Sequence, residues 1–107
     1  MEQAADRKGR LGGVLDLRLI DLYTTVAVLK ETIIRPSGAR RRVAAGMGLE
    51  ASVVTDRVKR VEKLLDVNLF DPGSPLELTR AGQQMADQGH ELVGRFVQSV
   101  KALQSLK

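Results

Sequence analysis

Residues 51–82 read ASVVTDRVKRVEKLLDVNLFDPGSPLELTRAG, and the order of patterns in this stretch decides the fold. The first part predicts a helix over about residues 50–65, because its apolar residues recur at spacings of three and four. The buried stripe of this helix consists of Val54, Val58, Val61 and Leu65. DPGSP (71–75) is typical of a tight turn, and LELT (76–79) alternates apolar and polar residues as a half-buried strand does. A further helical pattern follows, so the stretch predicts a helix, a two-stranded excursion and a second helix.

The chain before this stretch indicates a first helix from Leu15 to about Lys30. Asp16 is a candidate N-cap for it. The β-branched residues 32–34, which precede Arg35 and Pro36, favour a short extended piece. We expect this piece to pair with the strands of the two-stranded excursion.

A second helix is expected over residues 38–47, with Ser37 as its N-cap and Gly48 at its end. After the third helix the chain turns between Asp66 and Asp71. The apolar residues expected to point inward there are Val67, Leu69 and Phe70.

Residues 79–107 predict one long helix. Val93, Phe96, Val100 and Leu103 follow one another at spacings of three, four and three, which is a heptad seam. A helix of this length cannot bury its far end on so small a body, and a second copy of the chain would supply the missing surface. We therefore expect a dimerisation helix whose apolar residues are Met85, Leu92, Val93, Phe96, Val97, Val100 and Leu103.

The composition argues against several classes of protein. The chain has no Cys, which rules out disulfides and thiolate metal sites, and His90 is its only histidine. With no ligand cluster and no nucleophile beside a base, we expect no metal, no cofactor and no enzymatic activity. No apolar run reaches the roughly 20 residues of a membrane span, and the N-terminus has no signal-peptide core. The expected location is the cytoplasm.

The positive charge is concentrated in one segment. Residues 35–63 carry eight basic and three acidic residues, whereas the other 78 residues carry nine basic and ten acidic ones. A localised basic block attracts a phosphate backbone, although a run of charge is also common on an ordinary solvated face. The third helix lies in this segment, and its outward side is polar and basic, which suits a DNA major groove.

These patterns predict a mainly α protein: a winged helix-turn-helix with a small β-wing and a long C-terminal dimerisation helix. Residues 1–13 are interpreted as a flexible N-terminal tail. Residues 14–79 would form the DNA-binding domain, and residues 80–107 the linker and dimerisation helix.

The residues that carry these patterns also carry a family resemblance. Residues 54–82 resemble the DNA-binding head of LysR-type transcriptional regulators and, more distantly, ModE-type heads. That family has Leu-Glu at the end of its recognition helix, then Leu-Gly-x-x-Leu-Phe, a Gly-bearing wing, and Leu-Thr-x-x-Gly opening a linker helix. Here Val61-Glu62 and residues 65–70 stand in the first two places, and residues 78–82 match the third. The resemblance implies a winged helix-turn-helix that reads DNA as a dimer.

The sequence also departs from the family pattern. Glu50-Ala51-Ser52 stands where the family has Ser-Gln-Pro, and Thr55-Asp56-Arg57 stands where it has Ser-Arg. Because these are base-reading positions, the target sequence cannot be carried over from the family. The chain ends after the linker helix, so we expect no ligand-sensing domain.

The candidate DNA-binding residues fall in three groups. The second helix opens with three arginines that can reach the DNA backbone, with a merely solvated surface as the alternative: Arg40, Arg41 and Arg42. The groove-facing set of the third helix is Ser52, Thr55, Asp56, Arg57, Lys59 and Arg60. Within this set Arg57 suits a guanine edge and Lys59 and Arg60 suit phosphates, but Asp56 can instead pair with Arg60 or Lys59 along the helix. Ser74 at the wing tip completes the candidates, as a backbone contact or as turn chemistry alone.

The sequence therefore favours a sequence-specific DNA-binding transcriptional regulator, repressor-like, that acts as a homodimer on an imperfect palindrome. Its partners would be double-stranded DNA and a second copy of the chain. The alternative is a protein-interaction module that keeps the winged-helix fold and binds or inhibits another regulator. The acidic residues Glu50 and Asp56 on the third helix favour this alternative.

Overall fold

The computed structural model describes residues 15–72 and 77–107. Within these residues the chain is mainly helical and has one small antiparallel sheet, in which Phe70 pairs with Leu78 and Asp71 with Glu77. The expected fold class, a winged helix-turn-helix with a long C-terminal helix, is thus confirmed. The elements are α2 (Leu19–Ile34), α3 (Ala39–Met47), α4 (Ala51–Leu65), β1 (Phe70–Asp71), β2 (Glu77–Leu78) and α5 (Arg80–Gln104).

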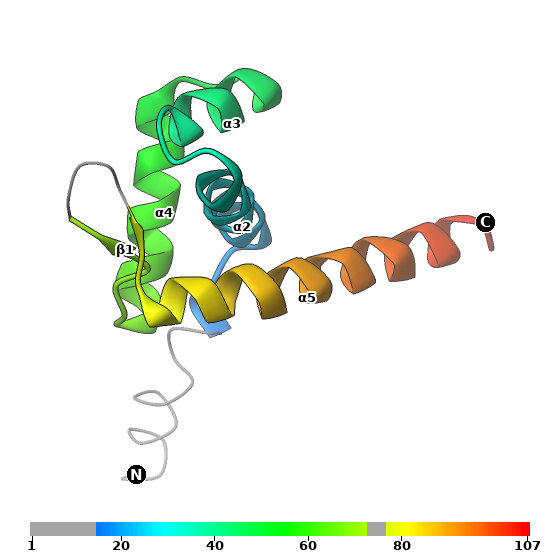
Figure 1. Cartoon of the computed structure of the whole chain (residues 1–107). Helices are drawn as coiled ribbons and strands as arrows, with labels where there is room; N and C mark the ends of the chain where they lie inside the picture. The colour runs from blue at the N-terminus through cyan, green and yellow to red at the C-terminus, as the bar shows by residue number, and fades with distance from the viewer. Residues whose placement is uncertain (1–14, 73–76) are drawn as a thin grey trace, which may run out of the picture.

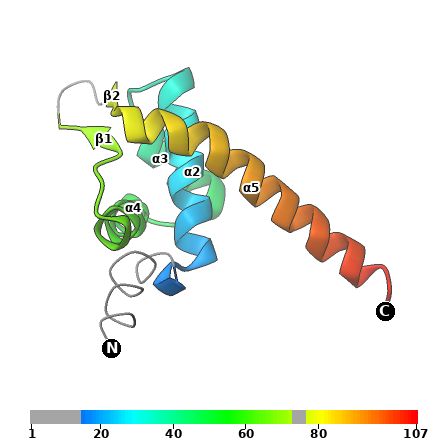
Figure 2. The ribbon, with the colours of Figure 1, turned by 90° about the horizontal axis from the view of Figure 1, so that it is seen from below.

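Helix α2 lies at the centre of the molecule and contacts each of the other three helices (Figure 1). Helix α3 meets the N-terminal end of α4, and the first half of α5 passes beside α2 (Figure 2). The second half of α5 extends away from the rest of the molecule in both views. The two strands, β1 and β2, form the wing beside the C-terminal end of α4.

The core is aliphatic and lies mainly between α2, α4 and the wing. Val54, Val58 and Val61 are fully buried, so the predicted stripe of the third helix is confirmed at these positions. They pack with Val28 and Leu29 of α2 and with the chain that follows α4. A smaller cluster joins α2 to α5 through Leu22, Val26 and Val93. No helix in the parts of the chain described here is both long and apolar enough to cross a membrane.

The exit from α4 depends on a residue with left-handed backbone and on a partly buried carboxylate contact. Asp66 has a φ of 55°, a region that Asp tolerates better than most residues with a side chain. The chain then reverses, and the Glu62 carboxylate accepts the backbone N–H of Leu69 at 2.7 Å. Leu69 and Phe70 are buried as predicted. The prediction for Val67 is wrong: it is 38% exposed, because the reversal turns its side chain toward solvent.

The start of α5 is hydrogen-bonded to the chain reversal that follows α4, at residues 68 and 69. The Thr79 hydroxyl accepts the N–H of Gly82 at 3.0 Å and donates to the carbonyl of Asn68 at 2.6 Å. The backbone N–H of Thr79 donates to the carbonyl of Leu69 at 3.1 Å. A Cβ on Gly82 would lie 2.1 Å from that carbonyl oxygen, so only glycine fits. The family motif at residues 78–82 therefore has a direct structural reason.

The extended piece predicted at residues 32–34 is wrong, because α2 continues through Ile34. Thr32 is accommodated in the helix because its buried hydroxyl donates to the carbonyl of Val28 at 2.7 Å. The helix ends at Arg35, the residue before Pro36, as proline sterics require. In the described residues the sheet contains only β1 and β2, and β2 lies against α2 without a third strand.

Two predicted helix caps are also wrong. Helix α2 begins after Arg18, so Asp16 lies too far upstream to cap it. Helix α3 begins after Gly38, whose left-handed φ of 77° makes it the cap in place of Ser37. The predicted end of α3 at Gly48 is confirmed, with a φ of 69°. The expected tail at residues 1–13 and the wing-tip residue Ser74 lie outside the described residues.

The close contact at Gly82 generates a stability prediction. Gly82→Ala is expected to lower the free energy of unfolding by about 3 kcal/mol, because the new methyl group must push α5 away from the backbone of Leu69. Gly94→Ala is the matched control, since a Cβ there meets nothing within 4 Å. It should stabilise the protein by about 0.5–1 kcal/mol through helix propensity. Urea unfolding at one fixed protein concentration measures both, and equal effects of the two substitutions would contradict the packing account.

Candidate nucleic-acid interface

The outward face of α4 is a polar stripe. Ser52, Asp56 and Lys59 are exposed and lie in line along the helix, with Thr55 half-buried at one side. Lys63 continues the line one turn further and is also exposed. We call these five residues the outer stripe of α4: Ser52, Thr55, Asp56, Lys59 and Lys63. It combines short hydrogen-bonding side chains near the N-terminus of the helix with two lysines toward its C-terminus.

Arg57 and Arg60 lie at the border between the outer stripe and α2. Arg57 is half-buried, and its Nη1 donates to the Thr24 hydroxyl of α2 at 3.1 Å. Arg60 donates to Asp21 of α2 through two atoms: Nε to Oδ2 at 3.0 Å and Nη2 to Oδ1 at 3.2 Å. Both arginines thus bind α2 while remaining next to the stripe.

The ion pair between Arg60 and Asp21 is unequal in exposure. The Asp21 side chain is 1% exposed, whereas that of Arg60 is 47% exposed. The hydrogen bonds from Arg60 to Asp21 raise the pKa of the guanidinium above its ordinary value. Asp21 also lies in the first turn of α2, where the helix dipole favours a negative charge. Arg60 therefore carries a permanent positive charge at the edge of the outer stripe.

The alternative pairing of Asp56 is wrong. In the described residues Asp56 forms no ion pair with Lys59 or Arg60, because the Arg60 guanidinium binds Asp21 of α2 instead. Asp56 is exposed in the middle of the outer stripe. Its carboxylate is therefore available to a partner outside the chain.

The three arginines of α3 have different environments. Arg41 is exposed. The Arg40 guanidinium lies over the Phe70 ring, 5.2 Å from its centroid, and its Nε is buried with no hydrogen-bond partner. This position links the start of α3 to the wing.

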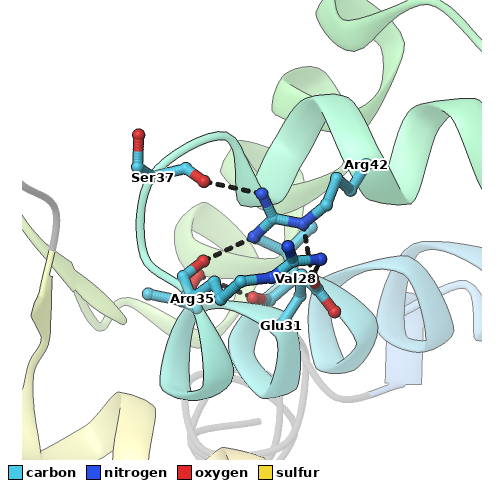
Figure 3. A network of polar contacts seen from close by, with 6 residues as sticks. Val28, Glu31, Arg35, Ser37 and Arg42 are labelled. Atoms are coloured by element: carbon cyan, nitrogen blue, oxygen red, sulfur yellow. Dashed lines mark hydrogen bonds and ion pairs between the residues drawn. The ribbon is translucent and has the colours of Figure 1, made fainter.

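The Arg42 side chain points toward the end of α2 and the loop between α2 and α3 (Figure 3). Its Nη1 donates to the carbonyl of Ser37 at 2.7 Å, its Nη2 donates to the carbonyl of Arg35, and its Nε donates to the Glu31 carboxylate. These contacts use three of its five N–H groups and join the end of α2 to α3. The structure thus gives Arg42 an internal role that the sequence pattern does not indicate, while its contact with phosphate stays a prediction.

Three residues of this region are not among the site residues predicted from the sequence. Lys63 could have been included from spacing, since it lies four residues after Lys59 and eleven after Ser52. Asp21 and Thr24 could not have been predicted as parts of the site. They lie on another helix, and both are fully buried at positions where helical periodicity leads one to expect apolar residues.

The expected dimer seam divides into two parts. Val93 is 8% exposed and Met85 is half-buried, and both pack within the same chain. Leu92, Phe96, Val97 and Leu103 are 60%, 48%, 41% and 67% exposed. Val100 is half-buried. In the described residues no group of three or more His, Cys, Asp or Glu side chains could hold a metal ion.

The comparison with known families agrees with this geometry. Residues 34–83 match the family of bacterial regulatory helix-turn-helix proteins, lysR family. The match runs from the end of α2 through α3, α4 and the wing to the first turn of α5, which includes the whole outer stripe. No curated protein and no solved structure gives a significant match to the chain. Over these 50 of its 107 residues the chain is therefore similar to the lysR family of bacterial regulatory helix-turn-helix proteins.

Proposed function

We propose that the chain is a sequence-specific transcriptional regulator that binds double-stranded DNA as a homodimer and acts as a repressor. The observation that carries the proposal is the outer stripe of α4: polar and basic side chains stand exposed on the helix that a DNA-binding family uses for recognition. An α-helix with its side chains is about 10–12 Å wide, which matches the major groove of about 12 Å.

The stripe suggests a division of roles along α4. Ser52 and Thr55 lie in the first two turns, where short hydroxyl side chains can meet base edges. Lys59 and Lys63 lie further along, where a long cationic side chain can reach a backbone phosphate. Asp56 between them can accept a hydrogen bond from cytosine N4. Arg40 and Arg41 of α3 would add contacts to the flanking phosphates.

The homodimer is supported by the apolar side chains on the far half of α5. Phe96, Val97 and Leu103 are 48%, 41% and 67% exposed, on the part of α5 that follows its last buried residue, Val93. Large exposed apolar groups in a row indicate a protein contact. A two-fold pair of chains would present two α4 helices to an imperfect palindrome, and DNA occupancy that blocks polymerase is the simplest mode of regulation. A bacterial regulator of this kind meets its DNA in the cytoplasm.

A protein-binding function is the second candidate, and Asp56 is the observation that favours it. Asp56 is exposed in the outer stripe with no internal ion pair among the described residues, and Glu50 is exposed at the N-cap of the same helix. Two carboxylates repel phosphate and could instead meet a basic surface of another regulator.

The function is tested by selecting bound duplexes from a random DNA pool at near-physiological salt. We expect enrichment of a two-fold-related site whose half-sites lie about one helical turn, or roughly 10 base pairs, apart. Failure of a folded protein to enrich any sequence would overturn base recognition and favour the protein-binding candidate.

The phosphate role of Lys59 is tested through the salt dependence of binding. Lys59→Ala should reduce the slope of log affinity against log salt concentration by about 1, because one phosphate contact is lost. Lys107→Ala is the control, since it removes the same charge at the end of the chain furthest from α4 (Figure 1). Fluorescence anisotropy titrations at several salt concentrations measure both slopes. Identical slopes for the two variants would exclude a phosphate contact by Lys59.

The homodimer is tested by placing a charge in the exposed part of the seam. Phe96→Glu should convert the dimer to a monomer, because an unpaired carboxylate would be buried at the contact. Gln98→Glu adds the same charge almost on the opposite side of α5 and should leave the dimer intact. Analytical ultracentrifugation distinguishes the two states. A wild-type protein that sediments as a monomer would contradict the proposed dimer.

A further inference from the structure

Two buried polar side chains of α2 contact arginines of α4. Asp21 is 1% exposed and Thr24 is fully buried, and they lie three residues apart on α2. Arg57 and Arg60 lie three residues apart on α4. The pairs match in register: Thr24 accepts from Arg57 and Asp21 accepts from Arg60. The two helices thus share a row of matched polar contacts directly beneath the border of the outer stripe.

A buried carboxylate at this place is costly unless it is paired, and an apolar side chain would pack the two helices without that cost. The pair at Asp21 uses two of the five N–H groups of the Arg60 guanidinium and leaves three. Nε and one hydrogen of Nη2 point to the carboxylate, so Nη1 and the second hydrogen of Nη2 form a free edge. Because the Arg60 side chain is 47% exposed while Asp21 is buried, this free edge faces solvent.

We propose that Asp21 is a positioning residue for DNA binding: it holds one edge of the Arg60 guanidinium so that the opposite edge meets a backbone phosphate. The inference rests on the proposed function and assigns a role to a residue that itself never touches DNA. The planar fork of Arg binds acceptors on two edges at once, which a Lys in the same place cannot do. Thr24 restrains Arg57 in the same manner nearer the start of α4.

A fixed phosphate contact sets the register of the recognition helix on the duplex, and this register decides which base edges Ser52 and Thr55 meet. Loss of the Asp21 carboxylate would leave Arg60 charged but unrestrained. General attraction to DNA would then persist, or rise slightly, because one negative charge near the interface is removed. Discrimination between sequences would fall.

The test compares wild type with Asp21→Asn, which keeps the shape of the side chain and removes its charge. Affinities are measured for the site selected from the random pool and for a scrambled duplex of equal length, well below the melting temperature of the variant. We expect the ratio of the two affinities to fall about fivefold or more, which is the lower end of the loss expected when one specific contact is removed. The affinity for the scrambled duplex should not fall. If the ion pair between Asp21 and Arg60 only stabilises the packing of α2 on α4, the substitution would lower the melting temperature and leave the ratio of affinities unchanged. That result would overturn the proposal.

A second measurement uses the wild-type chain and does not depend on the folding of the variant. The Nε–H resonance of Arg60, assigned by ¹⁵N NMR with the help of Arg60→Lys, should stay protected from exchange when the selected duplex is added. Its loss on DNA binding would show that Arg60 leaves Asp21, which overturns the proposal. A wild-type protein that shows no preference between the two duplexes overturns the proposed function itself, and the inference with it. An unchanged ratio in Asp21→Asn beside a discriminating wild type overturns only the inference.

Discussion

The carbonyl of Leu69 is the point on which the arrangement of α4, the wing and α5 depends. It accepts the N–H of Thr79, and it faces Gly82 at a distance that leaves no room for a Cβ. The N–H of Leu69 is held in turn by Glu62 near the end of α4. One residue thus ties the exit of α4 to the start of α5, with β1 and β2 between them in the chain. The orientation of the outer stripe relative to α5 follows from this contact.

Spacing along the chain was sufficient to predict the elements that are held by regular apolar contacts. The stripe of Val54, Val58 and Val61, the paired strands and the start of α5 all follow patterns of period two or 3.6. The prediction failed at Thr32, where β propensity was outweighed by a hydroxyl that bonds inside the helix. It also could not find the side-chain partners of Arg42, Arg57 and Arg60, because these side chains join residues eleven or more positions apart in directions that only the packed structure defines.

Counting charges along the chain overstates how much of the basic segment is free. The segment 35–63 has eight basic residues, but the guanidinium groups of Arg42 and Arg60 are already bound to carboxylates of α2. Lys59, Lys63 and Arg41 are exposed. The bound arginines contribute to the fold and to the electrostatic potential at once, so replacing one of them alters both. This explains why single-residue roles in such an interface need variants that separate charge from geometry.

The long helix α5 can be regarded as a lever. Val93 is its last buried residue, and the eleven residues from there to Gln104 extend about 16 Å. Over this length α5 faces α2 only across a groove that Val97 and Lys101 help to line. The pivot is tight, because Gly89 brings α5 so near Val26 that a Cβ would lie 2.8 Å from its methyl group. From Gly89 to Gln104 the arm is fifteen residues, or about 22 Å, so a tilt of about 5° at the pivot moves the free end by about 2 Å. In a dimer joined through the free ends, small changes of packing around Gly89 would therefore change the separation of the two recognition helices, and with it the spacing of half-sites that the pair tolerates.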